Sequence, residues 1–323
     1  MRAITVEAPG GPDVMQFTDV PTPVPGPGEV LVRTVAAGVN RADLLQRTGH
    51  YPPPPGISDV IGLEASGVVE ALSDDVDSWA VGDECVALLA GGGYAEYFVA
   101  PAGQLVRPPA GVDLVTAASL IEVAATVVSN MDHVGLKPGE TLLVHGGSGG
   151  IGVFAIQYAV QLGCRVATTA GTAEKLAFCR DLGAEIALDY HDDWASQLKE
   201  ATGGRGVDVI LDIMGAKYLE SNVASLALDG RMVTIGLQGG AKGTLNLGLL
   251  LSKRGTVTAT SLRFRSLEQK AQICERVATL VWPMVEAGTL RPAPIKTFPL
   301  SDAAAAHEWL DSGANVGKIV LVA

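Results

Sequence analysis

The chain has 323 residues, 48% hydrophobic and 18% charged, which is too apolar and too weakly charged for a disordered protein. Its length is about twice that of a common domain, so one large domain or two ordinary ones are expected. The net charge of −12 disfavours nucleic acid or an anionic membrane as the main partner. Backbone amides and a few local cations can still hold one anionic cofactor.

The four cysteines lie far apart and include no C-x-x-C pair, which favours reduced, buried thiols over a zinc knuckle or a disulfide framework. Residues 1–7 alternate like a strand and lack the pattern of a signal peptide. Gly, Lys or Asp interrupts the longest apolar stretches before about 18 residues, so no membrane-spanning helix is expected. These features predict a cytoplasmic globular protein.

Short β-like runs alternate with Gly/Pro-rich turns up to about residue 121, a texture typical of a barrel-like β domain. The runs are 28–35, 67–71 and 94–99. Turn-rich segments at 21–27 and 51–56 punctuate the same region.

From about residue 122 to 288, strand-like and helix-like segments alternate, which predicts a parallel sheet covered by helices on both faces. The helix-like segments include 153–160, which has an apolar packing face, and 174–182. The strand-like segments are 141–145, 165–169, 185–189, 207–212, 231–236 and 256–261.

After about residue 289 the texture is mixed, with a strand near 295–298, a helix over 301–311 and a last strand over 318–322. We expect these segments to complete the first domain. The sequence therefore predicts an α/β protein with one domain built from residues 1–121 and 289–323. A doubly wound parallel-sheet domain would occupy residues 122–288.

A glycine cluster follows the first strand of the predicted parallel sheet, where residues 145–152 read HGGSGGIG and contain G-x-G-x-x-G. An apolar strand precedes the cluster and an apolar-faced helix follows it, which is the context of a Rossmann dinucleotide site. The alternative is a glycine-rich turn that binds nothing. In the favoured interpretation the pyrophosphate lies on backbone amides at the start of the helix. The candidate contacts are Gly147, Ser148, Gly149, Gly150, Ile151 and Gly152.

The end of the second strand of this sheet indicates which nucleotide is bound. Enzymes that use NAD usually place an acid there to hold the ribose 2′-hydroxyl. This strand instead runs into Gly171 and Thr172, and a lysine, Lys175, follows. We therefore favour NADPH over NADH, with Thr172, Lys175 and Tyr190 as candidates to hold the 2′-phosphate. For Lys175 the alternative is a solvated helix lysine.

Several short motifs together resemble the medium-chain dehydrogenase/reductase superfamily, in its zinc-independent quinone oxidoreductase branch. The resemblance covers essentially the whole chain, and its motifs are specific only in combination. They are PGGP at 9–12, AGVNRAD at 37–43, GLEASGVV at 62–69 and VGD at 81–83.

The resemblance implies a GroES-like β-barrel domain built from both ends of the chain, a Rossmann domain between them, and an active-site cleft where they meet. It also implies NADPH-dependent one- or two-electron reduction of quinones. The expected assembly is a homodimer or homotetramer, in which the last Rossmann strand, 256–261, extends the sheet between subunits.

This sequence departs from the zinc-dependent relatives at the positions of the metal ligands. Those enzymes carry Cys where this chain has Asn40, and His where it has Leu63. No cysteine lies between Cys85 and Cys164, and the four-cysteine structural lobe is absent. A catalytic zinc needs three protein ligands, and Glu64 alone does not hold it. No catalytic metal is therefore expected.

Two polar residues are the catalytic candidates by match to the family motifs. Asn40 would hydrogen-bond an acceptor oxygen or the nicotinamide ribose, and Tyr51 would do the same through its hydroxyl. The alternatives are a turn residue for Asn40 and a packed loop aromatic for Tyr51. Without a metal, the sensible substrate is an acceptor that delocalises negative charge, such as a quinone or an enone.

Further cofactor contacts are expected where strands end, and one from the C-terminal segment. Arg263 would meet a phosphate or simply be solvated, and His133, His145 and His307 have no metal-ligand spacing. The remaining candidates are Met214, Gly236, Leu237, Ser261, Leu262 and Asn315.

Three functions remain in view. The favoured one is an NADPH:quinone oxidoreductase acting on a small-molecule quinone or related electrophile. An enoyl or alkenal reductase would share every cofactor motif. A non-catalytic NADPH- or RNA-binding protein is disfavoured because the chain is acidic and lacks a basic patch interleaved with aromatic residues.

Overall fold

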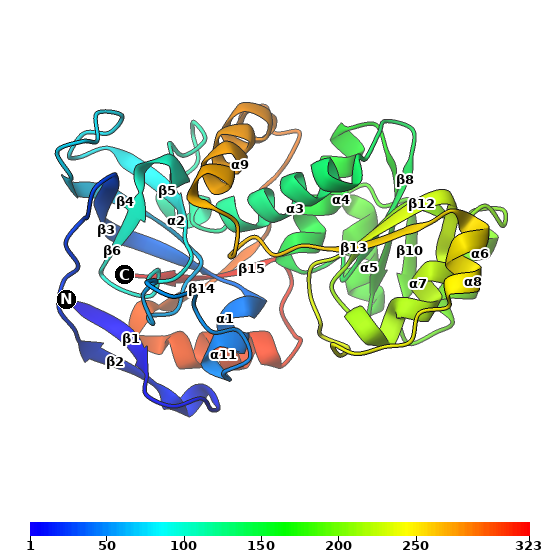
Figure 1. The fold of residues 1–323 in the computed structure, drawn as a ribbon, viewed down its shortest axis with the longest axis horizontal. Coiled ribbons are helices and arrows are strands. Elements are labelled where there is room, and N and C mark those ends of the chain that lie inside the picture. Colours follow the sequence, from blue (N-terminus) through cyan, green and yellow to red (C-terminus); the bar gives the residue numbers. More distant parts are fainter. The chain divides into compact units, whose positions relative to one another are not determined.

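A computed structural model describes all residues from Met1 to Ala323. Contacts between residues divide the chain into two compact units, shown in Figure 1. The first unit combines Met1–Ala125 with Leu262–Ala323, and the second is the continuous segment Thr126–Ser261. The two ends of the chain therefore build one unit together.

A seven-stranded sheet organises the first unit, with strand order β14-β15-β3-β4-β5-β7 and with β6 paired to β3. The long strand β3 lies at its centre and pairs antiparallel with β15, β4 and β6. A separate antiparallel pair joins β1 to β2. The strands are β1 (Arg2–Val6), β2 (Met15–Asp19), β3 (Glu29–Val39), β4 (Glu64–Leu72), β5 (Glu84–Leu88), β6 (Tyr97–Pro101), β7 (Leu105–Val106), β14 (Ile295–Pro299) and β15 (Lys318–Val322).

The core of the first unit forms because inward-facing residues of these strands pack under a helix from the C-terminal segment. Val30, Val32 and Phe98 are buried together with Ala303 and Ala306 of that helix. Small alanine side chains let the helix approach the sheet closely. The helices of this unit are α1 (Arg41–Arg47), α2 (Leu114–Ala117), α9 (Leu267–Leu280), α10 (Trp282–Glu286) and α11 (Ala303–Asp311), and α3 (Ile121–Val134) continues into the second unit.

The second unit is a six-stranded, wholly parallel sheet with strand order β10-β9-β8-β11-β12-β13. The order reverses between β8 and β11, which is the point where doubly wound folds bind ligands. Helices alternate with the strands along the chain and can be followed in Figure 1. The elements are β8 (Thr141–His145), α4 (Gly150–Gln161), β9 (Arg165–Ala170), α5 (Ala173–Asp181), β10 (Ile186–Asp189), α6 (Trp194–Ala201), β11 (Val207–Asp212), α7 (Leu219–Ser225), β12 (Leu226–Thr234), α8 (Leu247–Lys253) and β13 (Thr256–Ala259).

The strands of this second sheet are apolar on both faces because helices cover both. Leu142, Leu143 and Val144 of β8 are wholly buried, as are Ile210 and Leu211 of β11. A continuous apolar run of this kind is typical of a parallel strand covered on both sides. The α/β fold class predicted from the alternation of segments is therefore confirmed.

The unit boundary differs from the predicted one at its C-terminal end, because residues 262–288 group with the first unit. Helix α9 buries Ile273, Cys274 and Val277 and contacts β7 and the turn that precedes it. The indole Nε1 of Trp282 donates to the carbonyl oxygen of Arg107 at 2.8 Å. These contacts hold α9 and α10 in the first unit, although their helical texture resembles that of the second.

One helical stretch, Leu114–Val134, is long and apolar enough by composition to cross a membrane, with a mean hydropathy of 1.6. The expectation that no stretch reaches such a length was therefore wrong. In the structure, 78% of its apolar window is buried within the protein. Burial of this kind is typical of a core helix.

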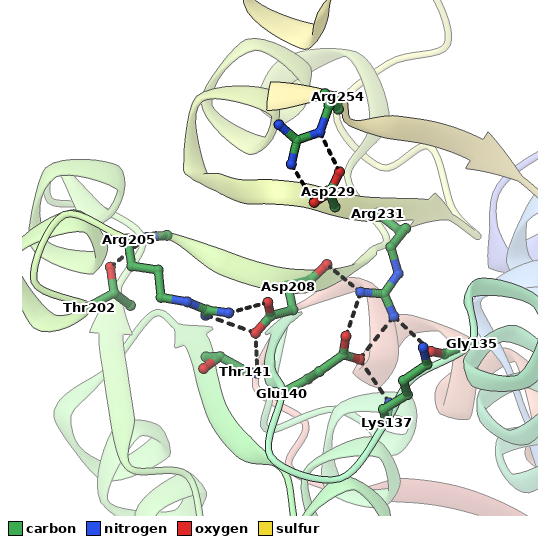
Figure 2. Close-up of polar contacts among 11 residues, drawn as sticks. Gly135, Lys137, Glu140, Thr141, Thr202, Arg205, Asp208, Asp229, Arg231 and Arg254 are labelled. Atoms are coloured by element: carbon green, nitrogen blue, oxygen red, sulfur yellow. Dashed lines mark hydrogen bonds and ion pairs between the residues drawn. The ribbon is translucent and has the colours of Figure 1, made fainter. Parts of the chain in front are cut away.

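An arginine at the amino-terminal edge of the second sheet joins several segments, as Figure 2 shows. The guanidinium of Arg231 donates to both carboxylate oxygens of Glu140, at 2.8 and 2.9 Å. It also donates to the carbonyl oxygens of Val134 and Gly135, at 3.0 and 2.7 Å. This cluster ties β12 to the turn before β8, on the sheet edge opposite the glycine cluster.

Candidate functional site

The glycine cluster forms a tight turn between β8 and α4. Gly146 has φ +73°, a left-handed conformation that glycine adopts without strain. A Cβ atom at Gly152 would overlap the carbonyl oxygen of Gly146 and the Cα of Gly147, and a Cβ at Gly147 would overlap the hydroxyl of Thr168. Only glycine therefore lets the first turn of α4 pack so closely on this loop.

The start of α4 faces the carboxyl-terminal edge of the sheet and can hold an anion. Gly149 precedes the helix with extended backbone, and Val153 donates the first helical hydrogen bond, to the carbonyl of Gly149, at 2.8 Å. The earlier N–H groups of a helix have no acceptor within it and carry its positive dipole end. Ser148, Gly150 and Ile151 lie at this helix start, so the predicted phosphate contacts come together.

Strand β9 ends without an acidic side chain. Thr172 caps α5 by accepting a hydrogen bond from the backbone N–H of Lys175 at 3.2 Å. The ring of Tyr190, which follows β10, lies against Gly171, where a Cβ atom would overlap the phenol oxygen. Gly171, Thr172, Lys175 and Tyr190 are thus neighbours at the ends of two paired strands. Lys175 is half-buried rather than fully exposed.

The turn after β11 is shaped by a buried carboxylate that sequence reasoning missed. Asp212 is fully buried and accepts hydrogen bonds from the N–H groups of Met214 and Gly215, at 3.0 and 2.9 Å. It also accepts one from the hydroxyl of Thr234 on β12, at 3.1 Å. Asp212 thereby fixes Met214 at the sheet edge.

Four more of the predicted residues lie just beyond strand ends. Gly236 and Leu237 follow β12, and the backbone of Gly236 packs against Ile213. Ser261 follows β13 and is the last residue of the second unit, whereas Leu262 begins the final segment of the first. The predicted cofactor residues of the second unit therefore all lie along one edge of its sheet.

In the first unit, Asn40 belongs to a buried cluster with Glu64 and Lys318. The Asn40 amide nitrogen donates to Glu64 Oε1 at 3.0 Å, and Lys318 Nζ donates to the Asn40 amide oxygen at 2.7 Å. Lys318 Nζ also donates to Glu64 Oε1 at 2.6 Å and to the carbonyl of Val39 at 3.1 Å. The other oxygen of Glu64 accepts from the backbone N–H of Glu122 at 3.0 Å.

Burial makes this pairing obligatory. Glu64 is 0% exposed and Lys318 3%, and a buried charge without a partner is strongly destabilising. A Cβ atom at Gly38 would overlap Glu64 Oε1, so glycine makes room for the carboxylate. Asn40 therefore does more than begin helix α1, since its side chain is held by two charged groups.

A second buried network lies on the other side of Asn40. The Asn40 backbone N–H donates to Asp43 Oδ2 at 2.7 Å, and the Tyr94 hydroxyl donates to the same oxygen at 3.0 Å. His307 Nε2 lies 3.2 Å from the Tyr94 oxygen. Burial raises the pKa of the Asp43 carboxyl to about 7. Asp43 Oδ1 has no hydrogen-bond partner.

This network continues from His307 toward the surface. Arg47 Nη1 lies 3.3 Å from His307 Nδ1, and Arg47 Nη2 is paired with Asp311 at 3.2 Å. Burial, together with the nearby Arg47, lowers the pKa of His307 to about 3, so the imidazole is neutral. Asp311 is 41% exposed at its side chain and also pairs with Arg41. The backbone around Asn40 is thus fixed by interactions that link it to the C-terminal helix α11.

Arg263 is buried, so the alternative of a solvated side chain is wrong. It donates to the carbonyls of Ala90 and Tyr51, at 2.7 and 2.9 Å, and to Gln46 Oε1 at 2.7 Å. Its guanidinium carbon lies 5.1 Å from the ring centroid of Tyr51, and Phe264 meets that ring edge-on at 5.8 Å. Arg263 therefore holds the Tyr51 loop, and a phosphate contact stays a prediction.

The remaining candidates make contacts within their own units. Asn315 is half-buried before β15, and its amide donates to the carbonyl of Gly317 at 2.9 Å. His145 is buried, with Nε2 2.7 Å from Asn222 Oδ1, and burial lowers the pKa of its imidazole. His133 lies 3.0 Å from the hydroxyl of Thr258. No group of three or more His, Cys, Asp or Glu side chains in the chain is placed to hold a metal ion.

The structure thus adds Lys318, Asp212 and the Asp43 network to the residues named from sequence. A signal for the first was present, because Lys318 begins an apolar strand and Glu64 lies in an apolar segment. Charged residues are almost never fully buried unless they are paired. Each of these two residues is therefore expected to have an oppositely charged partner, although the sequence does not identify Glu64 and Lys318 as partners of each other.

Two family models match the chain, one within the first unit and one mainly within the second. The alcohol dehydrogenase GroES-like domain matches residues 26–110, and the zinc-binding dehydrogenase domain matches residues 150–276. A quinone oxidoreductase from Pseudomonas aeruginosa is 33% identical over 99% of both chains. A 2-haloacrylate reductase from a Burkholderia species is 32% identical over 100% of this chain and 99% of its own.

A solved structure of similar fold is the Escherichia coli quinone oxidoreductase complexed with NADPH, with a TM-score of 0.90 and 30% identity over the full length of both chains. The chain therefore belongs to the medium-chain dehydrogenase/reductase superfamily, with the quinone oxidoreductases as its relatives. It is an oxidoreductase built from a GroES-like domain and a Rossmann domain.

Proposed function

We propose that the protein binds NADPH at the carboxyl-terminal edge of the second sheet and uses it to reduce quinones. The observation that carries the cofactor proposal is the glycine turn, where Gly147 and Gly152 leave no room for a side chain and α4 begins beside them. The NADPH complex of the Escherichia coli relative supports the same choice. The pyrophosphate would lie on the amides of residues 148–152.

The 2′-phosphate of the cofactor would lie between Thr172, Lys175 and Tyr190. No carboxylate ends β9 to repel it, and Thr172 begins helix α5, whose N-terminal dipole favours an anion. Met214, Gly236, Leu237 and Ser261 would contact the rest of the cofactor from neighbouring strand ends. Leu262, Arg263 and Asn315 stay predicted cofactor contacts.

The Lys175→Ala variant is expected to weaken NADPH binding about tenfold or more, since a hydrogen bond to a charged group contributes about 1.5–3 kcal/mol. NADH lacks the 2′-phosphate and should lose little. Calorimetric titration with both nucleotides measures the two dissociation constants. Lys199→Ala, at an exposed position of helix α6, is the control and should change neither. Equal losses for both nucleotides in Lys175→Ala would show that the lysine does not contact that phosphate.

When bound, the nicotinamide supplies a hydride to the acceptor, and the protein orients the acceptor and stabilises its developing charge. Asn40 offers an amide N–H for this purpose, and Tyr51 offers a phenol hydroxyl. A quinone suits such a site because it spreads the incoming charge onto its oxygens, which solvent then protonates. The quinone oxidoreductase relatives support this acceptor class.

Asn40→Ala and Tyr51→Phe are each expected to lower kcat/KM for a quinone about twofold to tenfold, the range for loss of one hydrogen bond. Neither change should abolish turnover, since neither side chain transfers the hydride. Steady-state NADPH oxidation with ortho- and para-quinones measures the effect, and circular dichroism confirms folding. Wild-type constants in both folded variants would remove these residues from the proposed mechanism.

Reduction of α,β-unsaturated carbonyl compounds is the second candidate, favoured by the 2-haloacrylate reductase relative. Both reactions deliver a hydride to a conjugated acceptor, so the same cofactor site serves either. A panel of quinones, 2-enals, enoyl thioesters and 2-haloacrylate under identical conditions separates them. Turnover of the enoyl compounds without turnover of any quinone would overturn the quinone proposal.

We also propose that the protein works in the cytoplasm as a homodimer or homotetramer. Strand β13 is the edge of the second sheet, with β12 on one side. Helix α8 directly precedes β13 in the sequence, and its Leu247 and Leu251 side chains are 68% and 79% exposed. These side chains add exposed apolar surface that a second subunit could cover. Sedimentation velocity measures the assembly, and a monomer at micromolar concentration would contradict it.

A further inference from the structure

The three hydrogens of the Lys318 ammonium all have acceptors inside the protein. They are the carbonyl of Val39, the amide oxygen of Asn40 and Oε1 of Glu64, at 3.1, 2.7 and 2.6 Å. A lysine ammonium has three donors and no acceptor, so none is left for a ligand. Lys318 therefore acts on the site through its neighbours and does not bind substrate or cofactor itself.

The charged groups determine which way the Asn40 amide faces. An ammonium only donates, so the amide oxygen must face Lys318. An ionised carboxylate only accepts, so the amide nitrogen must face Glu64. A flipped amide would place its NH₂ group against the ammonium and its oxygen against the carboxylate, so both hydrogen bonds would be lost and both contacts would become repulsive.

One N–H of this amide remains. The Asn40 nitrogen carries two hydrogens, and one of them donates to Glu64 Oε1 at 3.0 Å. The amide oxygen is already engaged by Lys318. Asn40 is 9% exposed, so its second amide N–H can donate a hydrogen bond to a ligand that contacts this side chain. The backbone of Asn40 is also held in place, because its N–H donates a hydrogen bond to Asp43 Oδ2 at 2.7 Å.

We propose that Lys318 and Glu64 are positioning residues that fix the Asn40 amide as a donor, so that the site selects acceptors presenting a carbonyl oxygen at this point. The proposal rests on the proposed function, in which Asn40 faces the acceptor. A donor held in advance stabilises the charge that develops on the oxygen without reorganising during the reaction. Loss of this donor should lower kcat more than it changes KM, because the charge on the acceptor oxygen is absent in the ground state.

The decisive variant is the double substitution Lys318→Met with Glu64→Gln. It removes both charges together, so no carboxylate is left buried without a partner. With both charges gone the amide orientation is no longer enforced, and kcat for a quinone should fall about twofold to tenfold, as in Asn40→Ala. The KM for NADPH should change little. The single variant Lys318→Arg keeps Glu64 and a buried cation with its donors. Its kcat should therefore lie between that of the wild type and that of the Lys318→Met/Glu64→Gln variant.

A double-mutant cycle separates positioning from a general structural effect. Adding Asn40→Ala to the Lys318→Met/Glu64→Gln variant should lower kcat no further, because the residues act through one amide. Lys199→Met, an exposed lysine on α6, is the control and should behave as wild type. Melting temperatures show that each variant is folded.

Three results would overturn one or the other of two statements, the positioning role and the proposed function. Wild-type kcat in the folded Lys318→Met/Glu64→Gln variant, with a loss in Asn40→Ala, would overturn the positioning role and leave the proposed function intact. Additive losses in the cycle would also overturn it. Wild-type kcat and kcat/KM in folded Asn40→Ala would instead remove Asn40 from the proposed function.

Discussion

Replacing Gly152 with alanine is expected to abolish measurable NADPH binding and to destabilise the second unit. The added methyl group would overlap the carbonyl oxygen of Gly146 and the Cα of Gly147, which are backbone atoms and cannot rotate aside. The loop or the first turn of α4 must therefore move. Overpacking of this kind costs about 1–3 kcal/mol of stability, and the amides that would hold the pyrophosphate are displaced with the backbone.

Gly149→Ala is the matched control for stability. A Cβ atom at Gly149 lies 3.6 Å from the carbonyl oxygen of Gly146, an ordinary contact, and its φ of −83° suits any residue. The melting temperature of the cofactor-free protein should therefore fall in Gly152→Ala and stay near wild type in Gly149→Ala. Calorimetric titration with NADPH completes the comparison. Wild-type affinity in Gly152→Ala would show that the cofactor does not use this turn.

Replacing Arg231 with methionine is expected to destabilise the second unit by about 1.5–3 kcal/mol, because a half-buried carboxylate and two backbone carbonyls lose hydrogen bonds to a charged group. Glu140 would lose the cation that binds both of its oxygens, and the carbonyl of Gly135 would lose its donor (Figure 2). The carbonyl of Val134 would lose its bond to Arg231 as well. The Arg231–Glu140 side chains are 19% and 20% exposed, so water replaces these bonds only in part.

Arg254→Met is the control for this experiment, and the same figure shows it. Arg254 binds both oxygens of Asp229, at 2.8 and 2.6 Å, but the two side chains are 61% and 67% exposed. An exposed pair contributes about 0–1 kcal/mol. Hydrogen exchange resolved by peptide reports the loss within Thr126–Ser261 separately from the rest of the chain. Equal protection in Arg231→Met and Arg254→Met would contradict the stabilising role of Arg231.

Local patterns predicted much of the second unit. Strands 141–145 and 207–212 form as predicted, because apolar runs of that length between turns suit a buried parallel strand. The turn between β8 and α4 could be predicted because G-x-G-x-x-G between a strand and a helix is typical of a tight turn that holds a pyrophosphate. The residues that end each strand followed from the sheet order, so the predicted contacts lie along one edge.

Contacts between distant residues could not be predicted in the same way. Lys318 and Glu64 are 254 positions apart in the sequence. Their pairing depends on the order of the sheet, in which β3 lies between β15 and β4. Arg263 was assigned to a phosphate or to solvent, because its sequence position after β13 gives no hint of the three acceptors near the Tyr51 loop. Helix α9 was placed in the wrong unit for the same reason, since its apolar face matches either partner.

The Asn40 cluster also has a consequence for biosynthesis. Glu64 is made early and becomes buried with the first sheet, but its cation arrives only with β15, after the whole second unit has been synthesised. The second unit is continuous in the chain and can fold as soon as it emerges. The first unit must wait, with a carboxylate that is expensive to bury alone. A nascent chain that stops before Lys318 therefore holds a complete second unit and an unfinished first unit.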